Sequence, residues 1–250
     1  MTSRSANALL SRLEVKYGPH ELLSQFFMKA IQSINERGIS LRVTSFSELE
    51  EINLRNSESW RPLFPSFSPS TGGVKDKAGY AIVGDNHTGD TVATQAVRVF
   101  EWQDTHLKAE AESLRMMYAD PGTAARPGEE CRVTADIAKD IRGRVSLGGA
   151  IWYHPDYRRM QLPELFTRIT RAYAYVTYGV DQHIGFLAPD SVTKRIHIRS
   201  GFRETGDAMV MTNSLAYPDT ETSMTILRMW PSDIIDDAYL HLAHWRSKSG

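Results

Sequence analysis

The 250-residue chain contains a single cysteine, Cys131, and this scarcity excludes an internal disulfide. The chain also lacks an uninterrupted apolar run of the roughly 18 residues that cross a bilayer, and residues 1–20 lack the apolar centre of a secretory leader. We therefore expect a protein of the reducing cytoplasm with no membrane span. A lone cysteine is more often inert than nucleophilic, so we do not assign Cys131 a catalytic role.

The chain also has no excess of either charge sign: it contains 29 basic and 30 acidic residues, and its formal net charge is -1. Nucleic-acid binding relies on a basic surface, so we expect no nucleic-acid partner. Neither a nucleophilic serine or cysteine signature nor the paired ligand spacing of a zinc site is present. His241 and His244 stand three residues apart without a nearby third ligand, and we interpret them as surface residues and expect no metal.

Apolar periodicity predicts one α+β domain over residues 20–250, preceded by a flexible lead-in at residues 1–19. The expected sheet is mostly antiparallel, with helices on both faces. Helices are predicted at 20–37, from an N-cap at Ser47, at 105–118, at 162–178, at 191–200, and from Ser232 onward, the last burying Ile234, Ile235, Ala238, Tyr239 and Leu242. Strands are predicted at 39–46, 80–84, 91–102, 145–153, 183–188, 202–212 and 223–229, while 131–143 stays ambiguous, with a short helix at 135–141 as one option.

Residues 144–178 organise the rest of the chain. Alternating apolar residues up to Tyr153 indicate a strand, and a 3.6-residue apolar stripe from Leu162 to Val176 indicates a helix. Basic residues occupy the turn between them. A helix start presents free N–H groups and a positive dipole end, so this turn suits a phosphate group.

Residues 60–75 carry three prolines and two adjacent glycines, which prevent a regular element. Large apolar side chains nevertheless lie among them, at Trp60, Leu63, Phe64 and Phe67. Two interpretations stay open. The segment is either a loop packed on the core or the lid or wall of a substrate pocket.

Two segments resemble motifs of the GCN5-related N-acetyltransferase (GNAT) superfamily. Residues 154–159, HPDYRR, resemble its V-x-P-E-Y-R-G signature, and residues 190–202, DSVTKRIHIRSGF, resemble its N-x-x-A-x-x-x-Y-x-x-x-G-F segment. The order of strand, carrier-binding helix, strand, short helix and Gly-Phe agrees as well. The specific likeness covers about residues 144–204, and it identifies the chain as a divergent member of this superfamily.

The resemblance implies a GNAT-like fold: a mixed, mostly antiparallel twisted sheet with helices on both faces and a splayed central strand pair that admits the pantetheine arm of coenzyme A. A strand bulge at Gly148-Gly149 would open this gap, although tight packing under a helix is an alternative role for the two glycines. Backbone groups of Trp152 and Tyr153 would bind the arm. The carrier-binding residues implied by the likeness are Trp152, Tyr153, His154, Arg158, Arg159, Met160, Gln161, Leu162, Pro163 and Asp190.

The phosphate loop departs from the superfamily pattern Q/R-x-x-G-x-G/A. Arg158, Gln161 and Pro163 stand at the matching positions, so both small residues are replaced and Pro163 removes one N–H donor. Charge-assisted hydrogen bonds from Arg158 and Arg159 would compensate, unless the pair is simply solvated.

The chemistry implied is direct attack of an amine on a thioester. His154 is the first candidate for the base, with Glu110 and Glu112 as alternatives. His197 replaces the superfamily's tyrosine as the candidate acid that protonates the leaving thiolate, unless it is a surface residue without a role. A simpler role for Asp190 than carrier binding is to act as the N-cap of the following helix.

Three functions follow as hypotheses. The first is an acyl-CoA-dependent N-acyltransferase, using acetyl-CoA or another acyl-CoA and a small-molecule amine. The second is an acyl-homoserine-lactone or N-acyl amino acid synthase-like enzyme fed by acyl carrier protein, although the first 60 residues lack the homoserine-lactone signature. The third is a catalytically silent binding protein of the same fold. A homodimer stays open as a partner alternative.

Overall fold

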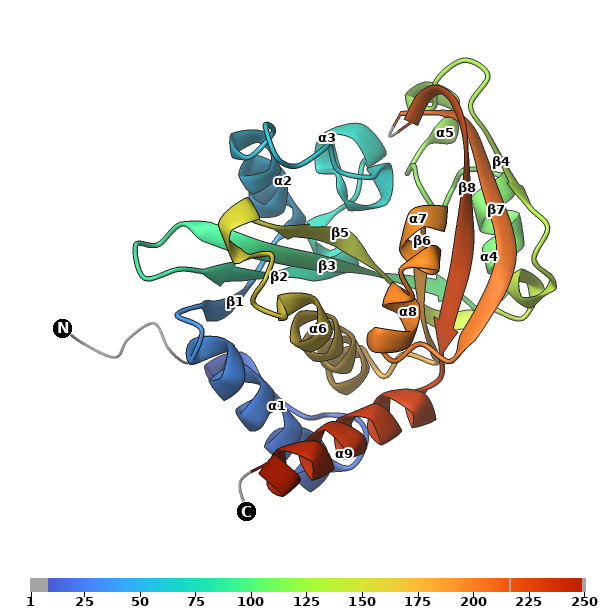
Figure 1. Cartoon of the computed structure of the whole chain (residues 1–250). Coiled ribbons are helices and arrows are strands. Elements are labelled where there is room, and N and C mark those ends of the chain that lie inside the picture. The colour runs from blue at the N-terminus through green and yellow to red at the C-terminus, as the bar shows by residue number, and fades with distance from the viewer. Residues whose placement is uncertain (1–8, 216, 249–250) are drawn as a thin grey trace.

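The computed structural model describes residues 9–215 and 217–248. In this part of the chain eight strands form one sheet, in the spatial order β1-β2-β3-β5-β6-β8-β7-β4 (Figure 1). The strands are β1 (Ser40–Thr44), β2 (Gly79–Asp85), β3 (Thr91–Trp102), β4 (Glu130–Val133), β5 (Gly143–Tyr153), β6 (Gln182–Leu187), β7 (Glu204–Ser214) and β8 (Tyr217–Met229). Every pairing is antiparallel except β5 with β6. The expected mixed, mostly antiparallel α+β sheet is confirmed.

Helices cover both faces of this sheet, as Figure 1 shows. One face carries α1 (His20–Asn35), α6 (Leu162–Tyr178) and α9 (Pro231–Lys248), and the other carries α2 (Phe46–Arg55), α3 (Pro69–Gly72) and α4 (Leu107–Glu112). The short helices are α5 (Pro121–Ala124), α7 (Pro189–Thr193) and α8 (Ile196–Arg199), with 3-10 turns at Leu10–Arg12, Pro65–Phe67, Asp76–Ala78, Asp136–Lys139 and Pro155–Tyr157. None of the described helices is both long enough and apolar enough to cross a bilayer.

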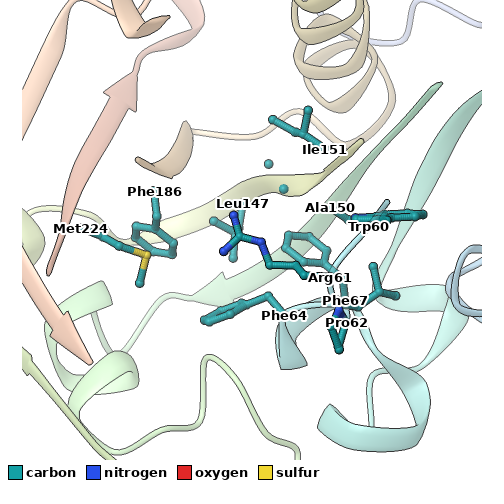
Figure 2. Close-up of a pocket in the computed structure, with 13 residues that line it drawn as sticks. Trp60, Arg61, Pro62, Phe64, Phe67, Leu147, Ala150, Ile151, Phe186 and Met224 are labelled. Carbon is teal, nitrogen blue, oxygen red and sulfur yellow. The ribbon is translucent and has the colours of Figure 1, made fainter. Parts of the chain in front are cut away.

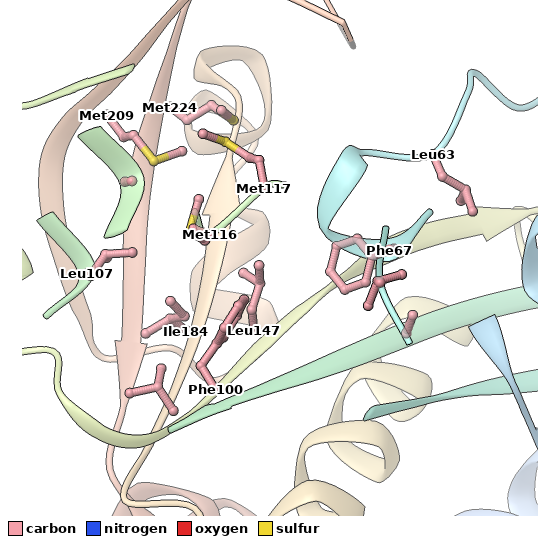
Figure 3. Close-up of a cluster of buried hydrophobic side chains, with 14 of the residues drawn as sticks. Leu63, Phe67, Phe100, Leu107, Met116, Met117, Leu147, Ile184, Met209 and Met224 are labelled. Carbon is pink, nitrogen blue, oxygen red and sulfur yellow. The ribbon is translucent and has the colours of Figure 1, made fainter. Parts of the chain in front are cut away.

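Two apolar cores result, one on each side of the sheet. On the α6 side, Phe26 and Phe27 of α1 pack with Phe166 of α6 because each helix turns an apolar stripe inward. On the other side, Phe100 and Leu147 pack with methionines from β7, β8 and the segment after α4 (Figure 3). β2, β3, β5, β6 and β8 contribute to both cores because their side chains alternate between the faces, whereas β1, β4 and β7 contribute to one core each.

The central strand pair separates early. β5 and β6 are parallel, and α6 is the crossover that such a pair requires. They pair over three rungs only, from Val145 with Gln182 to Leu147 with Ile184, although β5 continues to Tyr153 and β6 to Leu187. The expected splayed central pair is therefore present.

A bulge in β5 accompanies this separation, but it lies two residues beyond the predicted glycine pair. Gly149 pairs with Ala96 and Trp152 pairs with Thr94, so Ala150 and Ile151 together face Gln95. Ala150 adopts a left-handed φ of 50°, and its carbonyl accepts a 2.9 Å hydrogen bond from the Thr94 hydroxyl. Such a bulge bends its strand and turns it away from the neighbour.

Gly148 and Gly149 instead mark close approaches, which is the alternative the sequence left open. A Cβ atom on Gly149 would lie 2.6 Å from Cζ of Phe67, and one on Gly148 would lie 3.1 Å from the His183 ring. Side chains therefore lie directly against the β5 backbone on both faces of the strand at this point.

Several element boundaries differ from the sequence predictions. Ser45, rather than Ser47, caps α2, because its side chain accepts a hydrogen bond from the Glu48 N–H. The helix predicted at 105–118 ends at Glu112, and Leu114 follows with a left-handed φ of 61°. The ambiguous residues 131–143 contain the end of β4 and a 3-10 turn.

Packing corrects one further expectation. Tyr239 of α9 is 60% exposed rather than buried and Ile235 is only partly buried, whereas Ile234, Ala238 and Leu242 face the core as predicted. Within the expected lead-in at residues 1–19, Leu9 is fully buried and donates its N–H to the Leu41 carbonyl at 3.1 Å. Residues 1–8 lie outside the described residues, and the flexibility of the lead-in stays a prediction.

Candidate functional site

Two cavities meet where β5 and β6 separate. The first, which we call the slot, has a volume of about 370 Å³ and lies between these strands, α6 and α8. The second, the front pocket, has a volume of about 210 Å³ and lies on the other side, against residues 60–67. Gly148, Ile151 and Phe186 line both cavities. The gap in the sheet therefore joins the two sides.

Unpaired polar atoms face the slot. Gln95 Oε1, the Tyr153 hydroxyl and His197 Nδ1 are buried, belong to residues that line the slot, and have no hydrogen-bond partner in the described part of the chain. A buried polar group without a partner costs about 1–3 kcal/mol, so native proteins rarely leave one unpaired. Three around one cavity fit a ligand that carries several amide groups, as a pantetheine arm does.

His183 is a slot residue that the sequence analysis missed. It is 1% exposed, and burial next to Arg171 lowers its pKa to about 3, so its ring is neutral near pH 7. Its Nδ1 atom lies 2.8 Å from the Ser146 hydroxyl, and its ring stacks with that of Phe202 at 5.9 Å between centroids. A neutral imidazole with so low a pKa is a poor base, but it suits a hydrogen bond at the base of the slot.

The start of α6 opens into a third cavity, the basic cavity, of about 250 Å³. Arg158 and Arg159 line it with Pro163 and Glu164, and it shares Pro163 with the slot. No side chain caps this helix, because the N-cap residue Gln161 has a left-handed φ of 55° and makes no capping bond. The free N–H groups and the two exposed arginines suit an anion, whereas the Glu164 carboxylate opposes one.

The backbone of this turn is held from two sides. Arg158 donates from Nε to the Tyr153 carbonyl at 3.3 Å, and Arg37, in the turn after α1, donates to the Met160 carbonyl at 2.9 Å. Leu162 is fully buried, so it anchors the helix start in the core rather than lining a cavity. The turn therefore reaches the cavities through its two arginines, Gln161 and Pro163.

Arg171 of α6 fixes the wall that carries His197. It is 1% exposed and donates to the Ser200 carbonyl at the end of α8 and to the Asp237 carboxylate of α9. Asp237 also accepts from Arg168 Nε at 2.9 Å. Burial lowers the pKa of Arg171 to about 10, which still leaves it charged at neutral pH. The buried cation ties α8 to two long helices.

The front pocket is walled by the segment whose role the sequence left open. Trp60, Phe64 and Phe67 line it, while Trp60 and Phe67 are also buried in the core. The segment is thus packed against the core and is a pocket wall at once (Figure 2). The Trp60 ring stacks on Trp152 at 5.3 Å between centroids.

The two candidate catalytic histidines are placed differently. His197 lines the slot, as its assigned role requires. His154 lies beyond the end of β5 and is not among the residues that line the slot, the front pocket or the basic cavity. Its Nδ1 atom lies 3.6 Å from the Asp156 carboxylate and its ring contacts Trp152 and Tyr157 edge-on. The base role of His154 stays a prediction.

The remaining candidates lie elsewhere. Glu110 binds Arg115 and Thr105, and Glu112 binds Lys108 and the Val133 N–H, so both act in structural contacts. Asp190 belongs to α7, but its side chain lies outside the described residues. Burial raises the pKa of Cys131 to about 12, which agrees with an inert thiol.

No protein-family model matches the chain, and no curated protein matches it significantly. Among solved structures it is similar to a spermidine N-acetyltransferase from Vibrio cholerae described as dodecameric, with 8% identity, coverage of 78% of this chain and 95% of that one, and a TM-score of 0.47. It is also similar to a chimera of the Vibrio cholerae enzyme SpeG and hSSAT, with 9% identity, coverage of 80% and 99%, and a TM-score of 0.49.

At such identities and TM-scores, we take neither fold nor activity from these proteins. The chain's own topology is more informative, because its one parallel pair separates after three rungs, encloses the slot and is followed by the short helices before Gly201-Phe202. These features agree with the splayed central strand pair that the sequence resemblance implies.

Proposed function

We propose that this protein is an acyl-CoA-dependent N-acyltransferase that transfers an acyl group, most simply acetyl, to a small-molecule amine. The observation that carries the proposal is the gap between β5 and β6, where the slot and the front pocket share Gly148, Ile151 and Phe186. A thioester at the end of a flexible arm and an amine from the opposite side can meet there, which places the two reactants within reach of one another.

The carrier runs from the basic cavity into the slot in this proposal. Arg158, Arg159 and the free N–H groups of α6 bind its pyrophosphate, and the two cavities join at Pro163. The pantetheine amides pair with Gln95 and Tyr153, which otherwise have unpaired buried atoms. The fit of an amide-bearing arm to these atoms supports coenzyme A as the cosubstrate.

The transfer step is a direct displacement. The amine nitrogen forms a C–N bond to the thioester carbonyl carbon and loses a proton to solvent, while the C–S bond breaks. His197 gives a proton to the leaving thiolate and is reprotonated from solvent. The front pocket has no histidine, aspartate or glutamate among the described residues that line it. The ammonium group of the acceptor must therefore lose its proton outside the front pocket, either to solvent or, as the sequence predicts, to His154. The amine then reacts in its neutral form.

A carrier-protein donor is the second candidate, and one observation favours it. Pro163 lies where the slot meets the basic cavity and offers no N–H, and Glu164 lines the same cavity. A phosphopantetheine has a single phosphate and needs fewer donors than a pyrophosphate. The proposed experiment therefore includes an acyl carrier protein.

Calorimetry with acetyl-CoA, a long-chain acyl-CoA and an acyl carrier protein tests the proposal, followed by thiol release in the presence of amines. Gly185→Met supplies a slot-blocking variant, because a Cβ there meets only Phe202 and Leu227 at 3.7 and 4.0 Å and the added side chain fills the slot. Gly122→Met, on the exposed α5, is the matched control.

We expect acyl-CoA binding that Gly185→Met weakens at least tenfold and that Gly122→Met leaves unchanged. Binding of the carrier protein alone would select the second candidate. The absence of binding to all three carriers would contradict the acyltransferase proposal and favour a silent binding protein.

A further inference from the structure

We infer that the acceptor is an aromatic or similarly bulky α-amino acid, held in the front pocket with its carboxylate on Arg61 and its side chain among the aromatic walls. This inference rests on the proposed acyltransferase function and specifies its second substrate. Its basis is the composition, size and rigidity of the front pocket.

The pocket is apolar and of defined size. Its described lining is dominated by Trp60, Leu63, Phe64, Phe67, Ile151, Phe186 and Met224. An apolar cavity of about 150 Å³ holds a benzene molecule, and the front pocket measures about 210 Å³. The space is sufficient for an aromatic ring with a short polar head.

The charge of the pocket is unusual for an amine-binding site. Arg61 is the only charged side chain among the described residues that line it, and Figure 2 shows this side chain extending into the cavity between Phe64 and Leu147. A polyamine carries several positive charges, and here it would lose water without meeting a carboxylate. A guanidinium instead suits a bidentate bond to a carboxylate.

The position of Arg61 is fixed by its backbone. Asn53 of α2 is 5% exposed and donates from its side-chain amide to the Arg61 carbonyl at 2.9 Å. Next to it, Trp60 stacks on Trp152, whose indole N–H donates to Ser59 at 3.2 Å. The backbone that carries Arg61 is thus anchored, so a ligand need not order this segment on binding, although the Arg61 side chain itself is exposed.

The relative placement of the groups favours an α-amino acid over a longer ω-amino acid. The amine must reach the gap at Gly148 and Ile151, and Arg61 lines the same small cavity as these residues. Amine and carboxylate therefore bind close together, as on one carbon atom, while the aromatic body occupies the space beside Phe64 and Phe67.

The test compares three acceptors with acetyl-CoA: phenylalanine, phenethylamine and spermidine. Thiol release gives kcat/KM for each, and quenching of tryptophan fluorescence, sensitive to the Trp60–Trp152 stack, reports acceptor binding independently of turnover. We expect phenylalanine to be preferred at least tenfold over phenethylamine, as one charge-assisted hydrogen bond implies, and spermidine to be the poorest.

Two arginine variants sharpen the result. Arg61→Leu should remove the preference for phenylalanine over phenethylamine while retaining coenzyme A affinity. Arg55→Leu, on the exposed side of α2 and outside the front pocket, should keep the preference.

Distinct outcomes separate the two levels of inference. If acyl-CoA binds but spermidine is preferred, or if Arg61→Leu keeps the preference, the amino-acid inference is overturned and the acyltransferase proposal stands. If no carrier binds, the acyltransferase proposal fails. Fluorescence titration then still tests whether phenylalanine occupies the pocket through Arg61. An absence of quenching by phenylalanine would overturn the amino-acid inference as well.

Discussion

Nδ1 of His183 lies 2.8 Å from the hydroxyl oxygen of Ser146, across the second of the three rungs that join β5 and β6. Both side chains are buried, and the strands separate one rung later. The contact therefore holds the closed end of the gap on which the proposed reaction depends. The energy of this hydrogen bond and the ionisation of His183 can both be measured without a substrate.

Ser146→Ala should destabilise the fold, because it leaves a buried ring nitrogen of His183 without its partner. We expect a loss of about 1–3 kcal/mol in the free energy of unfolding, measured by urea denaturation at pH 7. Ser57→Ala, at an exposed position, should change stability by less than about 0.5 kcal/mol. Equal effects of the two variants would mean that the hydrogen bond contributes nothing.

Stability should fall as the pH drops below about 6.5. Burial lowers the pKa of His183 to about 3 in the folded state, while the unfolded value is about 6.5. The unfolded chain therefore binds more protons between these values, so the stabilising contribution is complete above about pH 6.5 and is lost toward pH 3. The slope from this one group is about 1.4 kcal/mol per pH unit at most.

The test for this pH dependence is His183→Gln, which should flatten the profile of unfolding free energy between pH 6 and pH 4. His241 contributes in the same direction, because burial lowers its pKa to about 4. His241→Gln measured in parallel separates the two contributions. A profile unaltered by His183→Gln would show that His183 does not titrate as described.

Gly149→Ala should be destabilising by about 1–3 kcal/mol, because the new methyl group overlaps the Phe67 ring. Phe67→Leu removes part of that ring and should relieve the overlap. In a double-mutant cycle, the second substitution should therefore cost less in the Gly149→Ala background than in the parent. Thermal denaturation of the four proteins gives the coupling, and strict additivity would contradict the contact.

Arg158→Ala combined with Arg159→Ala should weaken acyl-CoA binding about 10- to 100-fold, because two charge-assisted contacts to phosphate are lost. Glu164→Gln should tighten binding, since its carboxylate lines the same cavity. Calorimetry at low and high salt measures both effects, which should shrink as salt rises. Arg132→Ala on β4 is the control, and an unchanged affinity of the double variant would refute the phosphate role.

His197→Phe should lower kcat about 100-fold for acetyl-CoA with little change in carrier affinity, because the leaving thiolate loses its proton donor. A thioester with a more acidic thiol leaves without protonation, so the defect should largely disappear with such a donor. His87→Phe, in the exposed β2–β3 turn, serves as control. An equal defect with both thioesters would assign His197 a structural role.

The amino-acid sequence determined the elements and their order. Repeats of 2.0 and 3.6 residues depend on neighbouring residues alone, and β3, β6 and α6 were predicted from them to within a residue. Motif spacing then indicated the β5–α6–β6 unit and its basic turn. The start of α2 was misplaced by two residues because serines at 45 and 47 are both capable caps, and only the backbone conformation distinguishes them.

The convergence of distant residues at the gap follows from tertiary packing alone. Gln95, Ser146 and His183 come from three strands, and their meeting depends on strand register, which no local pattern specifies. The bulge lies at Ala150 and Ile151 rather than at the glycines, and Phe67, from a segment some eighty residues earlier in the sequence, occupies the space above Gly149. The position of Arg61 in the site has the same physical cause. It depends on packing across the sheet and not on the neighbouring residues in the sequence.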